Sequence, residues 1–367
     1  MKNLFVVILL GVFFLVGIMP VGYAAVIRNT APWMNNIIWQ GDIRLRYEHE
    51  TNDPGMDTNR QRLRFRYGFE TKVNDQFKVG ARIASGSDAS PTSTNQTLAR
   101  EFRKKDLWLD LAYVDYTPNE SMNIKGGKFK NPFFCTDMVW DTDVTFDGAV
   151  MNIVSGESKD YGEYVLVFGM FAIDDAERND PWLGAVQLQT KTKTDEGINM
   201  DAGITYYGFN RIKGYIPVEG KGTNTLSGGV YPKNFQLINP TLVIDFGKTL
   251  GGEVPMGIIT DYIYNTEASV KKEAGRIGAW VGKKVLEEKD DWKFIFQYSD
   301  VERDALLDIF PDADFNNGGT NAKGYELIFD YALQKNVVFT VDYYCTETEA
   351  GSKSDEEVIQ VDLVVKF

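Results

Sequence analysis

The stretch RQRLRFRYGFE, residues 60–70, alternates strictly between two kinds of side chain. One parity carries Leu63, Phe65, Tyr67 and Phe69, and the other carries Arg62, Arg64 and Arg66 after Arg60. Successive side chains of a β-strand point to opposite faces of the sheet, so this pattern predicts a strand with one apolar and one basic face. The fold must therefore offer the strand an oily environment on one side and a polar one on the other.

The same alternation recurs along the rest of the chain. We count sixteen such segments, at residues 41–48, 60–70, 77–84, 107–117, 121–130, 147–155, 163–174, 182–194, 197–209, 235–248, 255–264, 275–285, 291–300, 322–334, 336–347 and 357–367. Many run for about ten residues, the length that a tilted strand needs to cross a bilayer. Tight turns, such as residues 73–76, alternate with long polar loops, such as 86–106 and 131–146.

These segments favour a membrane barrel over a soluble β-sandwich. Lipid offers no hydrogen-bond partners, so a sheet in a membrane must close on itself. An even number of strands, with short turns at one end and long loops at the other, is the sequence signature of such a barrel. We predict an all-β fold, a transmembrane antiparallel up-and-down barrel of about 16 strands. No internal domain boundary is indicated.

The N-terminus has the pattern of a secretory signal. Lys2 precedes an apolar run over residues 4–19, and the small residues before Ala25 suit cleavage. We expect a cleaved signal peptide over 1–25, a leader over 26–37 and the barrel over 38–367; an uncleaved anchor is the alternative. The net charge of −13 and the export pattern argue against nucleic acid as a partner.

Three residues are of types that can support covalent or metal chemistry. Cys135 and Cys345 lack the spacing of a disulfide framework or a zinc site, so we expect two separate thiols, with pairing between them left open. His49 is the only histidine and has no Gly-x-Ser-x-Gly context, so we expect a surface residue and no catalytic site. We expect no cofactor and no metal, with a loose calcium site among the aspartates of 137–147 as the alternative.

The segments GDIRLRYEHE, NRQRLRFRYGFETKVNDQFKVGARIASG, LAYVDYTP, IKGGKFKNPF and the terminal VDLVVKF resemble the putative porin family of Gram-negative outer membranes, whose architecture is that of general diffusion porins. The likeness is strongest over residues 38–155 and at the C-terminus. It implies an outer-membrane channel for passive diffusion of small hydrophilic solutes and ions. It also implies contact with the lipid bilayer and lipopolysaccharide, a homotrimer, and an assembly machinery that reads the terminal Phe367.

The barrel prediction also indicates which face of the sheet each charged side chain takes. If the apolar parity faces lipid, six arginines face the lumen, because a charge at mid-bilayer costs ~2–4 kcal/mol. They are Arg44, Arg46, Arg62, Arg64, Arg66 and Arg82. The resemblance implies that the third long loop, 131–146, folds into the pore and narrows it. Its acidic residues would then oppose the arginines and select solutes by charge; they are Asp137, Asp141 and Asp143, with Asp147 at the edge of the next strand.

Other interpretations remain open. In one alternative the arginines only hold neighbouring strands together, through ion pairs with Asp42, Glu48 and Glu70. A more specific anion or oxyanion channel of the phosphate type is the nearest functional rival, because the basic ladder is real. An outer-membrane enzyme, or an adhesion barrel acting through loops 210–234 and 300–321, is a more distant one. We expect weak selectivity and leave its sign open.

Overall fold

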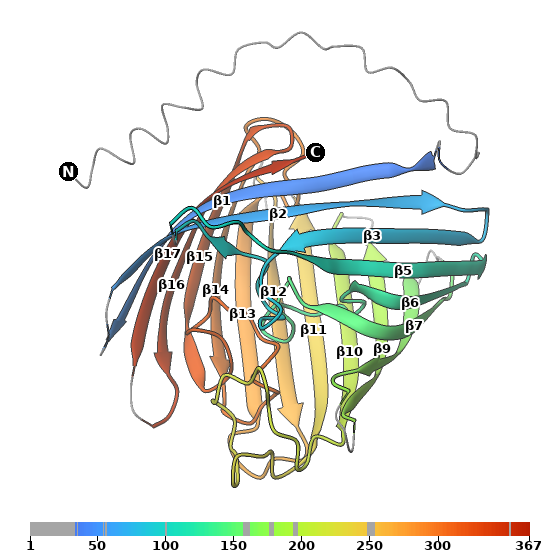
Figure 1. Cartoon of the computed structure of the whole chain (residues 1–367). Coiled ribbons are helices and arrows are strands. Elements are labelled where there is room, and N and C mark those ends of the chain that lie inside the picture. Colours follow the sequence, from blue (N-terminus) through green and yellow to red (C-terminus); the bar gives the residue numbers. More distant parts are fainter. Residues whose placement is uncertain are drawn as a thin grey trace. The chain divides into compact units, whose positions relative to one another are not determined.

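The computed structural model shows long antiparallel strands that follow one another around a barrel (Figure 1). It describes residues 34, 36–53, 55, 57–99, 101–156, 162–175, 180–193, 197–247, 254–351 and 354–367. The signal peptide expected over 1–25, and most of the leader expected over 26–37, lie outside these residues. The barrel belongs to the unit Ile37–Phe367.

Seventeen strands form a single sheet, and one of them is only two residues long. Their bounds are β1 Ile38–Asp53, β2 Thr58–Lys72, β3 Phe77–Ser85, β4 Gln96–Thr97, β5 Leu107–Asn119, β6 Met122–Lys130, β7 Thr145–Val154, β8 Glu163–Ala172, β9 Trp182–Lys193, β10 Asn199–Asn210, β11 Phe235–Gly247, β12 Met256–Asn265, β13 Glu273–Gly282, β14 Trp292–Val301, β15 Ala322–Gln334, β16 Val337–Thr348 and β17 Asp355–Lys366. All sixteen segments predicted by alternation are strands. The predicted fold class is therefore confirmed.

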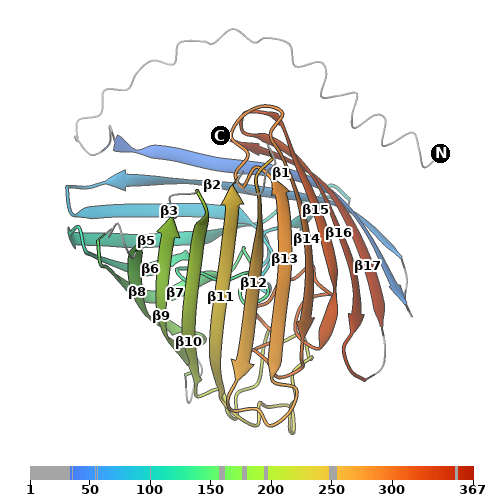
Figure 2. The same cartoon turned by 180° about the vertical axis from the view of Figure 1, so that it is seen from behind.

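The sheet closes between its first and last strands. β1 pairs antiparallel with β17, from Asp42 opposite Lys366 to Asp53 opposite Asp355, and it pairs with β2 on its other edge. Each further long strand pairs with the next long strand along the chain, which gives the up-and-down order seen from both sides in Figures 1 and 2. Closure leaves no edge strand unpaired among the strands of the described residues, which is the condition for a sheet surrounded by lipid.

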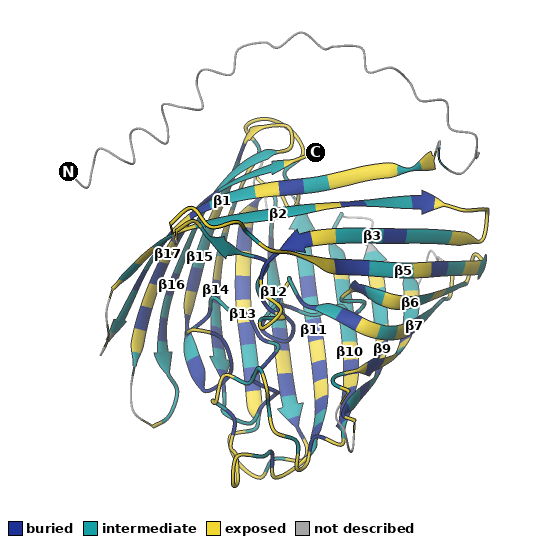
Figure 3. Ribbon diagram, in the orientation of Figure 1, coloured by how far each residue is buried: buried dark blue, intermediate teal, exposed yellow. Residues whose placement is uncertain are grey.

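Alternation along each strand separates two chemical faces. In β13, Arg276 and Trp280 are buried, whereas Ile277 between them is 60% exposed. Figure 3 shows the same banding of buried and exposed residues along this strand. Buried polar side chains and exposed apolar ones take opposite parities, so the barrel is polar inside and apolar outside, as the sequence predicted.

The strand β4 was not predicted. It lies in the loop after β3 and pairs with the part of β2 that extends beyond the β2–β3 ladder, with Thr97 opposite Arg62. Two residues are too short to show an alternating pattern, so no local signal marks this strand. Within the residues that the structure describes, no helix is long and apolar enough to cross a membrane.

The interior contains a packed core as well as polar groups. Buried aromatic and aliphatic side chains from the inner faces of β6 to β14 form one cluster with residues of the loop between β6 and β7. The loop between β14 and β15 contributes Leu306 and Leu307 to the same cluster. The loop between β10 and β11 contributes Ile212 and Tyr231. Three loops of the described chain therefore join this cluster, and the first of them is the predicted third long loop.

Candidate functional site

The six arginines assigned to the lumen lie on β1, β2 and β3 with their side chains turned away from the exposed apolar residues. Arg46 is 7% exposed, whereas its neighbour Tyr47 is 41% exposed. All six side chains are between 5% and 19% exposed, even though they carry a charge. A buried charge is tolerated only when it is paired, so the partners of these arginines decide what the inner wall can do.

Carboxylates of the same wall bind the arginines of β2. Asp42 on β1 accepts hydrogen bonds from Arg64 and from Arg66, with ion-pair distances of 2.8 and 2.7 Å. Arg62 pairs with Glu48 at 3.1 Å. These contacts follow from register, because β1 and β2 place the two sets of inward residues side by side. The β2 arginines are therefore compensated within the barrel wall.

The remaining arginines reach other parts of the chain. Arg46 binds both oxygens of Asp362 on β17, at 2.7 and 2.8 Å, and also binds Asp314. Arg44 donates to Asn95 in the loop after β3, at 2.8 Å. Arg82 pairs with Asp110 on β5.

The ladder of pairs considered from the sequence is thus present at Asp42 and Glu48. At Glu70 the partners differ from that interpretation. Glu70 accepts from Tyr113 and pairs with Lys78 at 3.5 Å. The inner wall of β1 to β3 is therefore a compensated network rather than a row of bare positive charges.

The loop between β6 and β7 is held in the barrel by apolar packing. Trp140 is 4% exposed, and its ring lies 4.6 Å from that of Phe146 and 5.8 Å from that of Tyr207. Phe133 packs edge-on against Phe171 of β8 and against Tyr207 of β10. Each large aromatic ring buries roughly 150–250 Å², so this contact supplies the free energy that keeps the loop away from water.

The three loop aspartates point in different directions. Asp143 accepts from the backbone N–H and the hydroxyl of Thr94 and lies 3.4 Å from Arg66. Asp137 pairs with Arg276 on β13, across the barrel from β2. Asp141 accepts from the backbone of Ala313, at 2.9 Å, and from that of Asp143. Only Asp143 of the three meets one of the six arginines.

Asp147 does not join this group. It lies on β7, opposite Lys128 of β6 in the register, and binds that lysine at 2.8 Å. Its neighbour Phe146 is 4% exposed and packs inward against Phe133 of the loop, whereas the Asp147 side chain is 57% exposed. Asp147 is therefore paired with Lys128 and, within the described residues, contacts none of the six arginines, so its place in the constriction stays a prediction.

The pKa values of the two neighbouring loop acids, Asp141 and Asp143, are shifted in opposite directions. Burial raises the pKa of Asp141 well above its usual value, and the negative charge of Asp143 raises it further. Burial also opposes ionisation of Asp143, but the guanidinium groups of Arg64 and Arg66, together with the Thr94 hydrogen bonds, outweigh it and lower the pKa of Asp143. Asp143 is thus the stably charged acid of the loop, and Asp141 is the one poised to take up a proton.

The sequence interpretation did not include the loop between β14 and β15 among the segments that fold into the barrel. Asp314 of this loop binds Arg46 at 3.0 Å, and the Asp312 backbone N–H donates to the Asp137 carbonyl. Asp308 accepts from the backbone N–H of Thr223, so the loop is also fastened to the loop after β10. Its apolar run ALLDIF, residues 305–310, is the signal that could have indicated burial.

Two cavities lie inside the barrel on either side of these contacts. The first has a volume of about 460 Å³ and is lined by the loop after β3, other long-loop segments and Asp143. The second, of about 380 Å³, is lined by Arg66, Arg82, Lys125 and Lys130 among others. The Arg66–Asp143 pair has one residue in each lining, so it stands between the two cavities.

Gly80 shapes the second cavity. A Cβ at this position would lie 2.6 Å from the ring of Tyr113. Only glycine therefore leaves room for the Tyr113 ring, whose hydroxyl donates to Glu70.

The residues considered for other chemistry lie away from these cavities. His49 contacts Asn59 at 3.2 Å and Thr51 at 3.4 Å, and no serine hydroxyl within the described ranges bonds to it. Cys135 and Cys345 are free thiols, as expected. Among the residues with described positions, no group of three His, Cys, Asp or Glu side chains is arranged to hold a metal ion.

Comparison with known families gives one match. The family model described as "Putative porin" matches residues 51–225 and 226–367. The two matched ranges together cover nearly all of the predicted barrel. Comparison with curated protein sequences gave no match.

Several solved structures share the architecture. OprB of Pseudomonas putida, in its high-pH structure, aligns with a TM-score of 0.62 and 12% identity, over 91% of this chain and 95% of that one. OmpF of Salmonella typhi, in complex with daunomycin, aligns with a TM-score of 0.55 and 10% identity, over 90% and 98%. The trimer form of OmpT of Vibrio cholerae aligns with a TM-score of 0.50 and 12% identity, over 90% and 99%. At these identities the likeness is one of fold.

Proposed function

The chain belongs to the putative porin family, whose members are channels of the Gram-negative outer membrane, and from this membership we propose that it passes small hydrophilic solutes and ions by diffusion. The observation that carries the proposal is the closed barrel with a polar interior, an apolar exterior and a loop folded into its lumen. Such a channel needs no turnover and no energy input. Its selectivity comes from the size and charge of the narrowest passage.

We propose that this charge selection is weak. The arginines of β1 to β3 are matched by carboxylates, so their fields largely cancel at the distance of a permeating ion. The Arg66–Asp143 pair sets a positive and a negative group against each other at the inserted loop. This arrangement supports a transverse field that discriminates by dipole and size more than by the sign of the net charge.

Bilayer recording tests the proposal. The refolded wild-type protein should conduct, with a reversal potential near zero in asymmetric KCl. Replacing Arg62, Arg64 and Arg66 by alanine should shift the reversal potential toward cation preference, because Asp42 loses both of its partners and Glu48 loses one. Lys335→Ala in the exposed β15–β16 turn is the matched control and should change nothing. Conductance and reversal potential that stay unchanged in the triple variant would remove the arginines from the pathway.

An oxyanion-preferring channel is the second candidate. The cavity of about 380 Å³ brings Lys125 and Lys130 together with Arg66 and Arg82, and within the described ranges Lys130 forms no ion pair. Convergent cations of this kind suit phosphate or sulfate. Inorganic phosphate should then reduce chloride current at millimolar concentration. A phosphate effect no larger than that of added chloride would exclude this candidate.

We also propose the assembly features that the family resemblance implies. These are removal of residues 1–25 on export, a role of Phe367 in barrel assembly, contact with lipopolysaccharide and a homotrimer. The trimer form of the Vibrio cholerae structure supports the last of these. Chemical cross-linking in native outer membranes, read by gel migration before and after heating, tests the trimer. A single cross-linked species of monomer size would exclude it.

A further inference from the structure

The larger cavity is enclosed by segments that are far apart in the sequence. Its lining comes from the loop after β3, from Asp110 of β5, from Asp143 of the inserted loop, and from residues 173–174, 215–219 and 309–310. All of these lie at the end of the barrel that carries the long loops. Its volume of about 460 Å³ falls within the range of roughly 300–1,000 Å³ typical of small-molecule sites.

The charges around this cavity are predominantly negative. Five carboxylates line it, against one lysine, Lys128, which is bound to Asp147. Arg82 and Arg66 neutralise two of the five, Asp110 and Asp143.

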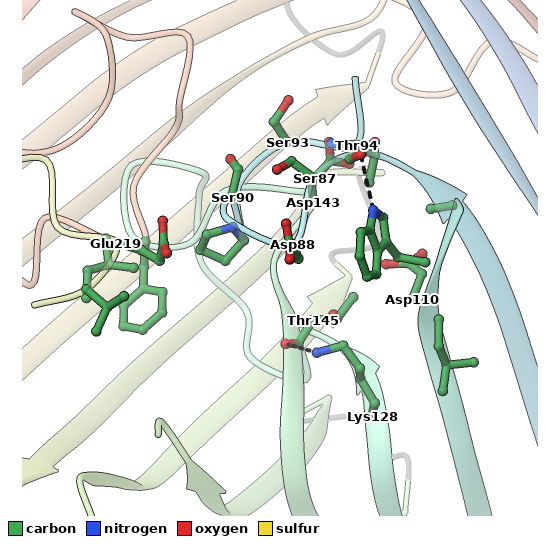
Figure 4. A pocket seen from close by; sticks show the side chains of 18 of the residues that line it. Ser87, Asp88, Ser90, Ser93, Thr94, Asp110, Lys128, Asp143, Thr145 and Glu219 are labelled. Carbon is green, nitrogen blue, oxygen red and sulfur yellow. Dashed lines mark hydrogen bonds between the residues drawn. The ribbon is translucent and has the colours of Figure 1, made fainter. Parts of the chain in front are cut away.

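The other three carboxylates are Asp88, Asp174 and Glu219. None of them forms an ion pair with a lysine or arginine in the part of the chain that the structure describes. Figure 4 shows Asp88 between Glu219 on one side and Asp110 on the other. The cavity therefore has uncompensated negative charge on more than one wall, and a low-dielectric lining strengthens its field.

Aromatic and hydroxyl groups complete the lining. The rings of Trp108, Tyr215 and Phe310 border the space. The Tyr215 hydroxyl donates to Asp174 at 2.8 Å, which fixes the orientation of both side chains. Serine hydroxyls at the end of β3 and in the loop after it line the cavity as well; they are Ser85, Ser87, Ser90 and Ser93. Aromatic faces attract organic cations, and the hydroxyls offer hydrogen bonds to a polyhydroxy solute.

From this combination we propose that this cavity of about 460 Å³, which we call the outer cavity, binds hydroxylated organic cations of about monosaccharide size. They bind there before they pass between Arg66 and Asp143. The proposal names a solute class for the pathway above and so rests on the proposed channel function. The second cavity, with Arg66, Arg82 and Lys130 in its lining, does not favour this class. Binding is therefore assigned to the outer cavity alone.

Three sugars that share one ring isolate the effect of charge. Glucosamine carries a positive amine at mildly acidic pH, glucose is neutral and glucuronate is negative. Calorimetric titration of the full-length protein in detergent should show that glucosamine binds about tenfold more tightly than glucose, and that glucuronate binds least. Added on the long-loop side of a bilayer, glucosamine should also interrupt the ion current.

A double variant tests the cavity itself. Asp174→Asn with Glu219→Gln should reduce glucosamine affinity by about tenfold, because it removes two of the three uncompensated charges. Glu267→Gln, in an exposed loop outside the cavity, is the matched control and should bind as wild type. If the double variant fails the heat-modifiability check for folding, Asp88→Asn in the exposed loop after β3 replaces it.

The outcomes separate this inference from the proposed function. Equal affinity for glucosamine and glucose, or unchanged affinity in a folded cavity variant, would overturn the binding site even if the protein conducts. Glucosamine binding that is lost in the variant supports the site. Absence of any ion conductance in the same preparation would refute the channel function and leave the measured site in place.

Discussion

Arg46 on the first strand and Asp362 on the last are joined by two hydrogen bonds, of 2.7 and 2.8 Å, between side chains that are 5% and 6% exposed. Residues at opposite ends of the chain thus form one of the most buried ion pairs of the barrel. The pair lies on the β1–β17 seam, where Arg46 is directly opposite Asp362 in the register. The pair therefore forms only when β1 and β17 meet and the sheet closes.

Removing one partner should weaken this seam. Asp362→Ala leaves the buried guanidinium of Arg46 with Asp314 at 3.0 Å and Glu48 at 3.9 Å, and such losses typically cost about 3 kcal/mol. Urea unfolding in lipid vesicles, followed by heat-modifiable gel migration, measures the change. Lys289→Ala, which removes the partner of exposed Asp290 at 4.0 Å, is the control and should cost much less. Equal costs for the two variants would contradict a special role for the seam.

Charge at the inserted loop should affect selectivity through Asp143 and not through Asp147. Asp143→Asn removes the acid that faces Arg66, so the reversal potential in asymmetric KCl should shift toward anion preference. Asp147→Asn, the same substitution four residues along the chain, should leave the reversal potential unchanged because that carboxylate is paired with Lys128 and not with the arginines. A comparable shift in both variants would show that Asp147 also lines the pathway.

The packing of Trp140 should control the width of the channel. Trp140→Ala removes a buried ring that contacts Phe146, Tyr207 and Phe310, at a cost of about 3–5 kcal/mol at this site. The loop should then move more freely, and single-channel conductance and current noise should both rise. Trp292→Ala, on the outer face where the ring is 38% exposed, should leave conductance unchanged. Wild-type conductance in the Trp140 variant would show that this packing does not hold the loop.

Contact between the two inserted loops should weaken as pH rises. Burial, with the charges of Asp137 and Asp314, raises the pKa of Asp312 well above its usual value, and the pKa of Asp141 is raised similarly. Because the native state then holds protons that the unfolded chain loses near pH 4, stability from these groups is present at acidic pH and declines as pH rises toward their native pKa values. Asp143 behaves oppositely, since its lowered pKa contributes stability above about pH 4 that is lost in stronger acid.

Hydrogen exchange of residues 131–144 and 302–321 measures this effect. Protection in wild type should be greater at pH 5 than at pH 8. Asp312→Asn, which mimics the protonated side chain, should flatten the dependence, whereas Asp290→Asn in an exposed turn should leave it as in wild type. Protection that increases with pH would contradict the assignment.

Much of the barrel could be predicted from the sequence because alternation is a local property. The period of two in residues 60–70 marks both the strand β2 and the face that each arginine takes, whatever the strand packs against. The same reasoning located all sixteen long strands, whereas the inserted loop was implied by the family resemblance. It failed at β4, where two residues carry no period.

The partners of the charged groups were decided by the tertiary structure. The sequence by itself determined that Arg46, Arg64 and Arg66 face inward. Only closure of the barrel brought Asp362 to Arg46, and only the inward folding of the loop after β14 brought Asp314 there. The physical reason is that alternation depends on neighbours along one strand, whereas charge compensation depends on contacts between residues hundreds of positions apart, which form only when the sheet closes and its loops pack inside.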